Sequence, residues 1–104
     1  MGQGQQHIIS RKLLREFADL HPEDPSLPEA LDEWFKKVRN ARWRTFSDIR
    51  TSYAHADLVG GLVVFNLGGN KYRIVARVFY TTGKVYIRAV MTHREYDRGR
   101  WMEL

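Results

Sequence analysis

The chain has 104 residues, which is enough for one domain with one modest core. Its 43% hydrophobic and 28% charged residues are ordinary globular values, and the lack of cysteine excludes disulfides, thiolate zinc sites and cysteine nucleophiles, as suits a reducing cytosol. The net charge of +5 is uneven: residues 1–59 carry nine Lys/Arg against nine Asp/Glu, residues 60–104 carry eight against three, and residues 60–92 carry five basic and no acidic residues.

Neither a signal peptide nor a membrane span is predicted. The polar opening Met1–Gln6 leads into no long apolar region, so it does not have the pattern of a secretory signal. The longest apolar runs are about half a dozen residues, far short of the roughly 20 that cross a bilayer. We interpret residues 1–6 as a cloning remnant or a frayed terminus. We expect a single cytoplasmic domain over residues 7–104.

Three helices are predicted in the first half of the chain. The first covers residues 11–20, where Ser10 is a suitable N-cap and one side carries Leu13, Leu14, Phe17 and Ala18. The second covers Pro28–Asn40, because apolar residues recur at helical spacing at Leu27, Leu31, Trp34, Phe35 and Val38. A short third helix over Ser47–Tyr53, with Ser47 as its cap, completes this half.

The pattern changes to strands after residue 60. Leu62–Leu67 is an almost continuous apolar strand, and Gly68–Asn70 has the composition of a turn. Lys71–Tyr80 and Lys84–Thr92 alternate between apolar and polar residues around a short glycine-bearing turn, which predicts a β-hairpin. The predicted fold class is therefore α+β: N-terminal helices packed on one face of an antiparallel sheet, with a short C-terminal helix or tail.

The alternation also predicts which side chains lie on the open face of the sheet. The two rows that should face the core are Tyr72, Ile74, Ala76, Val78 and Tyr80 on one strand and Val85, Ile87, Ala89 and Met91 on the other. This register puts Arg77 about opposite Arg88 and Arg73 about opposite Thr92. Lys71 and Tyr86 join them on the exposed surface. Like charges opposite each other cost stability, so the cluster indicates a surface that binds a polyanion such as RNA.

Most catalytic classes lack their pattern here. The four histidines, His7, His21, His55 and His93, do not have the spacing of a zinc site, and the basic stretch offers no carboxylates for magnesium. There is no G-x-S-x-G elbow, and Gly68–Lys71 is not a complete phosphate-binding loop. We expect neither a metal nor a cofactor.

The segment Met91–Asp97 gathers a histidine, an arginine, a tyrosine and two carboxylates at the end of the basic strand. RNA can be cut without a metal if the 2′-hydroxyl is activated, the leaving 5′-oxygen is protonated and cations meet the charge on phosphorus. Histidine and tyrosine can transfer protons, and arginine and lysine can stabilise the developing anion. The alternative is that His93 and Tyr96 only close the strand end and pack.

Two long blocks, Val64–Val75 (VFNLGGNKYRIV) and Tyr86–Asp97 (YIRAVMTHREYD), resemble HigB-type toxins of type II toxin–antitoxin modules. The opening His7–Lys12, followed by a leucine-rich helix, is similar to the usual start of that family. The resemblance implies a RelE-like fold, in which His7–Ile9 is a short first strand, and an mRNA interferase that acts on the ribosome. The implied partners are mRNA, the ribosome and a helix-turn-helix antitoxin of the HigA type, with DNA reached only through the antitoxin.

The resemblance also implies a set of catalytic residues: His93, Tyr96, Arg73, Lys71 and Arg88. Within it, Arg73 and Arg88 would bind phosphate, His93 would transfer a proton, Tyr96 would act in acid–base work or base stacking, and Lys71 would stabilise transition-state charge. Together with the exposed basic face, the predicted RNA-binding set is Lys71, Arg73, Arg77, Tyr86, Arg88 and Arg94. Asn70 is interpreted as a turn residue only.

Two other functions remain open for this sequence. One is a non-catalytic RNA-binding module that uses the basic sheet with Tyr72 or Tyr86 for stacking. The other is a toxin of the same fold that acts on gyrase. The pair His93 and Tyr96 after a basic strand favours the ribonuclease, because binding to gyrase needs no proton-transfer pair.

Overall fold

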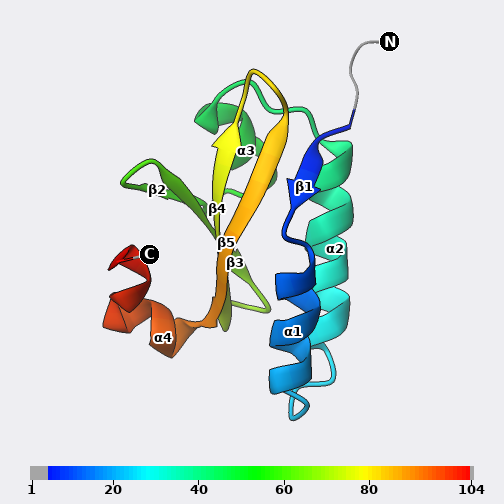
Figure 1. The fold of residues 1–104 in the computed structure, drawn as a ribbon, viewed down its shortest axis with the longest axis vertical. Coiled ribbons are helices and arrows are strands. Elements are labelled where there is room, and N and C mark those ends of the chain that lie inside the picture. Colours follow the sequence, from blue (N-terminus) through cyan, green and yellow to red (C-terminus); the bar gives the residue numbers. More distant parts are fainter. Residues whose placement is uncertain (1–4, 104) are drawn as a thin grey trace.

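The computed structural model describes residues 5–103 of the chain, which form a mixed sheet with helices on both of its faces (Figure 1). The strand order is β1-β5-β4-β3-β2, with β1 at His7–Ile9, β2 at Asp57–Val59, β3 at Leu62–Leu67, β4 at Tyr72–Phe79 and β5 at Lys84–Thr92. The predicted hairpin and the strand before it are confirmed. The sheet is not wholly antiparallel, however, because β1 runs parallel to β5, and the edge strand β2 was not predicted.

The first two helices form where they were predicted. Helix α1 spans Lys12–Leu20 and α2 spans Leu27–Asn40, and both pack on the same face of the sheet (Figure 1). Trp34 and Phe35 are buried in this main core. The prediction of Ser10 as N-cap is wrong: its backbone turns into the left-handed region (φ 72°) directly after β1, and Arg11 takes the cap position without a side-chain hydrogen bond. No helix in residues 5–103 is long and apolar enough to cross a membrane.

The third helix begins one residue earlier than predicted. Helix α3 spans Phe46–Ser52, and its N-cap is Thr45, whose hydroxyl accepts a hydrogen bond from the N–H of Asp48. Ser47 lies inside the first turn and is not the cap. The cap position needs an extended backbone before the helix, which Thr45 has and a residue within the helix cannot have.

Gln6, which the sequence analysis assigned to the polar leader, belongs to the folded domain. Its side chain is only 3% exposed. Its amide Nε2 donates to the carbonyl of Val38 at 2.7 Å, and its Oε1 accepts from the N–H of Trp43 at 3.2 Å. The glutamine thereby satisfies one carbonyl in the last turn of α2 and one N–H in the segment that follows the helix. Residues 1–4 lie outside the described residues.

A β-bulge interrupts the pairing of β4 with β5. On the side toward the β4–β5 turn Ala76 pairs with Ile87, and both side chains pack in the main core. On the other side Val75 pairs with Ala89, so Arg88 is an extra residue without a partner on β4. One extra residue reverses the faces of all residues beyond it, because the side-chain period of a strand is two.

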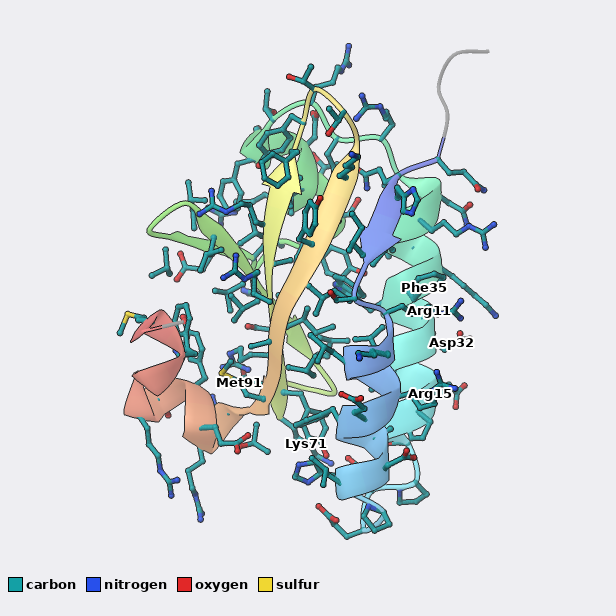
Figure 2. All side chains as sticks on the ribbon, viewed as in Figure 1. Arg11, Arg15, Asp32, Phe35, Lys71 and Met91 are labelled. Atoms are coloured by element: carbon teal, nitrogen blue, oxygen red, sulfur yellow. The ribbon has the colours of Figure 1, made fainter. Side chains whose placement is uncertain are left out.

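The bulge overturns the predicted orientation of the end of β5. Val90 packs against the main core, whereas Ala89 and Met91, which were predicted to face the helices, lie on the opposite face. Figure 2 shows Met91 on the side of β5 that faces the C-terminal segment, away from α1. There it forms a second apolar cluster with Val64, Val75 and Trp101.

The C-terminal segment folds back over this second cluster. Helix α4 (His93–Arg98) ends at Gly99, whose left-handed backbone (φ 77°) turns the chain into the 3-10 helix η1 (Arg100–Glu103). Trp101 is thereby buried on the sheet. The face that the sequence predicts to be open is therefore half covered, and only the part toward the β4–β5 turn stays free (Figure 1).

The loop between α1 and α2 is tied to the sheet through a carboxylate, which predicts a pH dependence of stability. Asp24 accepts hydrogen bonds from the Ser26 hydroxyl at 2.6 Å, the Tyr72 hydroxyl at 2.5 Å and the Ser26 N–H at 3.0 Å. These bonds, those of the Ser26 and Tyr72 side chains first, lower the pKa of Asp24 to about 2. A carboxyl whose folded pKa is depressed contributes stability above its unfolded pKa of about 4, and the contribution is lost as the pH falls through the folded pKa.

We therefore expect Asp24→Ala to lower the melting temperature at pH 7, and the difference from the wild type to shrink as the pH falls from about 4 to about 2. Melting curves by circular dichroism at pH 7, 4 and 2 measure it. Asp19→Ala, an exposed aspartate on α1, is the matched control. A difference that stays constant down to pH 2 would contradict this role of the Asp24 carboxylate.

Candidate active site

Three of the predicted catalytic residues meet where β5 passes into α4. Arg73 comes from β4, and His93 and Tyr96 come from the first turn of α4. Arg73 Nη2 lies 2.7 Å from His93 Nδ1, and the guanidinium carbon of Arg73 lies 5.3 Å from the centre of the Tyr96 ring. The fold therefore brings an arginine next to a histidine and a tyrosine that follow it by 20 or more residues in the chain.

Helix α4 holds its position through a capping box. The hydroxyl of Thr92 accepts from the N–H of Glu95 at 3.1 Å, and Oε1 of Glu95 accepts from the N–H of Thr92 at 2.9 Å. The N–H of His93 also donates to the carbonyl of Lys71 at 2.8 Å, which ties the helix start to the turn before β4. The first turn of α4 is thus fixed on both sides.

Arg73 is buried, which corrects the prediction that it lies on an exposed surface. Its side chain is 6% exposed, and Nη1 donates to the carbonyls of Asn70 and Tyr72, both at 3.1 Å. The C-terminal segment produces this burial by folding over that part of the sheet. Two carbonyls and one imidazole therefore hold the guanidinium in a defined orientation, with its charge directed at the start of α4.

The contacts of His93 determine which of its ring nitrogens carries the proton. A guanidinium only donates hydrogen bonds, so Nδ1 of His93 must accept from Arg73 and be unprotonated. The proton of the neutral ring is then on Nε2, which lies 3.1 Å from Oδ2 of Asp97. The result is a chain Arg73–His93–Asp97, in which a buried cation and a carboxylate hold the imidazole from opposite sides.

The ring of Tyr96 is packed, but its hydroxyl stays protonated at neutral pH. Trp101 stacks on the ring at 5.0 Å between centres and an interplanar angle of 14°, and the Arg73 guanidinium also lies over it. Partial burial raises the pKa of Tyr96 above its ordinary value, and the negative charge of Asp57 raises it further. Of the two predicted roles of Tyr96, proton transfer by the hydroxyl suits this packing better than base stacking does.

The remaining predicted residues lie outside this cluster. Lys71 is exposed and adjoins it through its backbone, while its positive charge is close enough to Asp24 to help lower the pKa of that carboxyl (Figure 2). Arg94 is exposed on the first turn of α4. Arg88 is exposed at the bulge, about 15 Å along β5 from His93.

The predicted pairings of the basic residues are also corrected. Arg77 pairs with Tyr86 and not with Arg88, because the register of the hairpin differs by two residues from the predicted one. Beyond the bulge, Arg73 pairs with Met91 and not with Thr92. The basic residues therefore do not converge on one point. Arg73 belongs to the cluster with His93 and Tyr96, and Arg77 and Tyr86 lie farther along the same face of the sheet.

Two residues of the cluster were missed by the sequence analysis, namely Asp97 and Trp101. The sequence does contain a signal for Asp97, because Thr92-x-x-Glu95 has the spacing of a capping box and so predicts a helix starting at His93. On such a helix Asp97 lies four residues from His93 and shares its face. No comparable signal marks Trp101, whose position depends on how the chain turns at Gly99.

Residues 5–103 contain no group of three histidine, aspartate or glutamate side chains that could hold a metal ion. A groove of about 580 Å³ lies elsewhere, between α1 and α2, where Arg11, Arg15, Asp32 and Phe35 contribute to its walls (Figure 2). The cluster itself is an open site, with the side chain of His93 46% exposed.

Comparisons with known proteins all identify the same toxin family. Residues 28–99 match the family model of HigB_toxin, described as the RelE-like toxic component of a toxin-antitoxin system. The mRNA interferase toxin HigB of Escherichia coli (strain K12) is 35% identical over 91 residues, which is 88% of each chain. The mRNA interferase HigB of Shigella flexneri has the same identity and coverage, and that of Escherichia coli O6:H1 is 25% identical over 95 residues, which is 88% of this chain and 89% of the relative. The family match includes Arg73, His93, Tyr96 and Asp97.

Proposed function

This chain belongs to the HigB toxins, the RelE-like toxic components of toxin–antitoxin systems, and on that basis we propose that it is an endoribonuclease that cuts mRNA at the cluster of Arg73, His93 and Tyr96. We assign the active site to this cluster because side-chain contacts link Arg73, His93 and Asp97 in a row. It combines a fixed cation, a group that can take up a proton and a carboxylate that stabilises the protonated form.

The first step is the activation of the 2′-hydroxyl. A phosphate oxygen of the RNA competes with His93 for the donors of Arg73, because a guanidinium binds a phosphate more strongly than a neutral imidazole. Nδ1 of His93 is then free to accept the proton of the 2′-hydroxyl. Asp97 accepts from Nε2 and stabilises the imidazolium that forms. The oxygen attacks the neighbouring phosphorus.

The second step is the departure of the 5′-oxygen. Arg73 stays on the phosphate and offsets the charge that develops on it. The hydroxyl of Tyr96 is protonated at neutral pH, as that of an ordinary tyrosine is, and its raised pKa keeps it so. It donates that proton to the leaving 5′-oxygen. Lys71, Arg88 and Arg94 supply further positive charge to the flanking phosphates, since all three are exposed on the segments that border the cluster.

The ribosome and an antitoxin are the proposed macromolecular partners, in the cytoplasm. The cluster is an open surface, so the substrate must be positioned from outside, and a ribosome that holds the message supplies this. Membership of the family implies an antitoxin. We propose one of the HigA type with a helix-turn-helix domain, whose acidic residues oppose the basic sheet face. DNA is reached only through that antitoxin.

The hypothesis of a non-catalytic RNA-binding module leaves the Arg73–His93–Asp97 chain without a role, since binding alone needs no histidine with a defined tautomer. A gyrase-directed toxin does not need it either. The proposed ribonuclease uses each of the three residues, and the names of the relatives, all mRNA interferases, support it.

Primer extension on one transcript tests this function. We expect cuts when the transcript is bound to programmed ribosomes, few cuts in the free transcript, and none after addition of a stoichiometric HigA-type antitoxin. Equally fast cutting of free RNA would remove the ribosome requirement, and cutting that persists in the purified complex would remove the antitoxin assignment. No cutting in any arm, with gyrase inhibited instead, would replace the ribonuclease by the gyrase-directed toxin.

A further inference from the structure

The sheet face that carries the cluster has a second, uncovered part. Near the cluster this face is covered by Trp101, which packs on Val64, Val75 and Met91. Farther along β4 the alternation continues through Arg77 and Phe79, both exposed. They point away from the main core, because their neighbours Ala76 and Val78 pack toward it.

An aromatic pair lies on this uncovered part. Phe79 of β4 is 42% exposed, although phenylalanine is usually buried. It contacts Tyr86 of β5 edge to face, with 5.5 Å between ring centres and an interplanar angle of 79°. One ring of an edge-to-face pair supports the other and leaves ring surface available to a third flat group.

Positive charge surrounds the pair, and no ion pair is formed there. Arg77 is the direct partner of Tyr86 across the two strands, and Lys84 is the partner of Phe79. Arg77, Lys84 and Arg88 are all exposed, and in residues 5–103 none of them forms a salt bridge. Residues 60–92 contain no acidic residue that could provide one from within this part of the chain.

The pair thus combines an exposed ring, Phe79, with a half-buried one, Tyr86, among cations without ion-pair partners. Such aromatic rings and cations are the elements of a site for single-stranded nucleic acid, in which bases stack on the rings and phosphates contact the cations. We propose that Phe79, Tyr86 and Arg77 bind a nucleotide of the mRNA outside the cleavage site: the base stacks on the aromatic pair and a phosphate contacts Arg77. This inference rests on the proposed function, because it takes the mRNA as the strand that lies on Arg73.

The position of the pair favours the messenger over other RNA. Phe79 lies six residues from Arg73 on the same strand and the same face, about 20 Å away. A single strand whose scissile phosphate sits on Arg73 can continue along this face for several nucleotides and reach the pair. The pair would therefore help to hold the substrate without touching the reacting atoms.

Binding to RNA measures this site separately from cleavage. The protein carries Tyr96→Phe, so that the RNA stays intact, and the probe is a fluorescent single-stranded RNA of about twelve nucleotides, followed by anisotropy. We expect Phe79→Ala and Tyr86→Ala each to weaken binding about ten-fold, and Phe79→Trp to preserve it, because stacking on one ring contributes an effect of that size. The control is Leu58→Ala, which removes another exposed apolar side chain from the same sheet, on β2, and should bind like its parent.

An otherwise identical RNA in which the nucleotides away from the cleavage site lack their bases tests the stacking itself. On this probe the Phe79→Ala effect should disappear. The same variants are also compared for binding to ribosomes that carry no mRNA. Unchanged affinity of both alanine variants for the complete RNA would overturn the proposal. A loss of affinity seen only with these ribosomes would also overturn it, since ribosomal RNA would then be the ligand of the aromatic pair. If the wild type cuts no mRNA on ribosomes but the alanine variants still lose affinity, the proposed function fails and the nucleotide site stands.

Discussion

Replacing His93 by glutamine should lower the rate of mRNA cleavage on ribosomes by about 10²–10⁴-fold while leaving ribosome binding nearly unchanged. Glutamine can still accept a hydrogen bond from Arg73 and donate one to Asp97. It can therefore replace the two contacts that the imidazole makes at 2.7 and 3.1 Å. It cannot take up a proton. Tyr96→Phe removes the other proposed proton-transfer group and should have an effect of the same order.

Single-turnover cleavage of one transcript on programmed ribosomes measures this, with ribosome binding followed by sedimentation. His7→Gln is the control, because that histidine is exposed on β1 and pairs with Lys84, at the opposite end of β5 from the cluster. Thermal melting should change little in all three variants, since His93 and His7 are exposed and Tyr96→Phe retains the ring that stacks on Trp101. Full activity of the His93→Gln, Tyr96→Phe double variant would remove the assignment of acid–base catalysis to these residues.

Replacing Arg73 by alanine should abolish activity and also destabilise the protein, by at least about 2 kcal/mol, or about 10 °C in melting temperature. The side chain is buried, and its loss leaves the carbonyls of Asn70 and Tyr72 without their donor and Nδ1 of His93 without its partner. An exposed phosphate-binding arginine would lose affinity for RNA without this cost in stability.

Arg73→Lys separates the two effects. Lysine retains the charge but cannot donate to two carbonyls and an imidazole in one plane, so we expect weaker destabilisation and still a large loss of cleavage. Urea unfolding gives the free energy of unfolding of each variant. Cleavage is measured without urea and well below the melting temperature of each variant, so that only folded protein is compared. Arg44→Ala, in an exposed position before α3, is the control. A melting temperature of Arg73→Ala equal to that of the wild type would show that the buried geometry of Arg73 is wrong.

The helices and strands could be predicted because their signals are local. The apolar side chains of α2, from Leu27 to Val38, recur with the helical period, and all of them are buried as the pattern requires. Leu62–Leu67 and Lys84–Thr92 were located to the residue from apolar content and turn composition. The segment around His93 and Tyr96 could also be found from the sequence, because these residues follow a basic strand and lie in a block that resembles one toxin family.

The incorrect predictions concern strand register and strand pairing, which depend on contacts between segments far apart in the chain. Alternation assigns Ala89 and Met91 to the core only if the register with β4 is unbroken, and no local pattern reveals that Arg88 is an extra residue. The short strand β2 was missed because three residues carry almost no periodic signal and are stabilised by pairing with β3.

For this protein, the sequence by itself determined most of the elements, the packing of the first two helices on one face of the sheet and the set of residue types available for chemistry, since these depend on periodicity and composition. Only the tertiary structure decided how those residues are used. The return of the chain at Gly99 places Trp101 on the sheet, which buries Arg73 and packs Tyr96. It also leaves Phe79 and Tyr86 free on the same face. Burial and hydrogen-bond partners arise from contacts between segments far apart in the chain, and a pattern read along one segment cannot contain them.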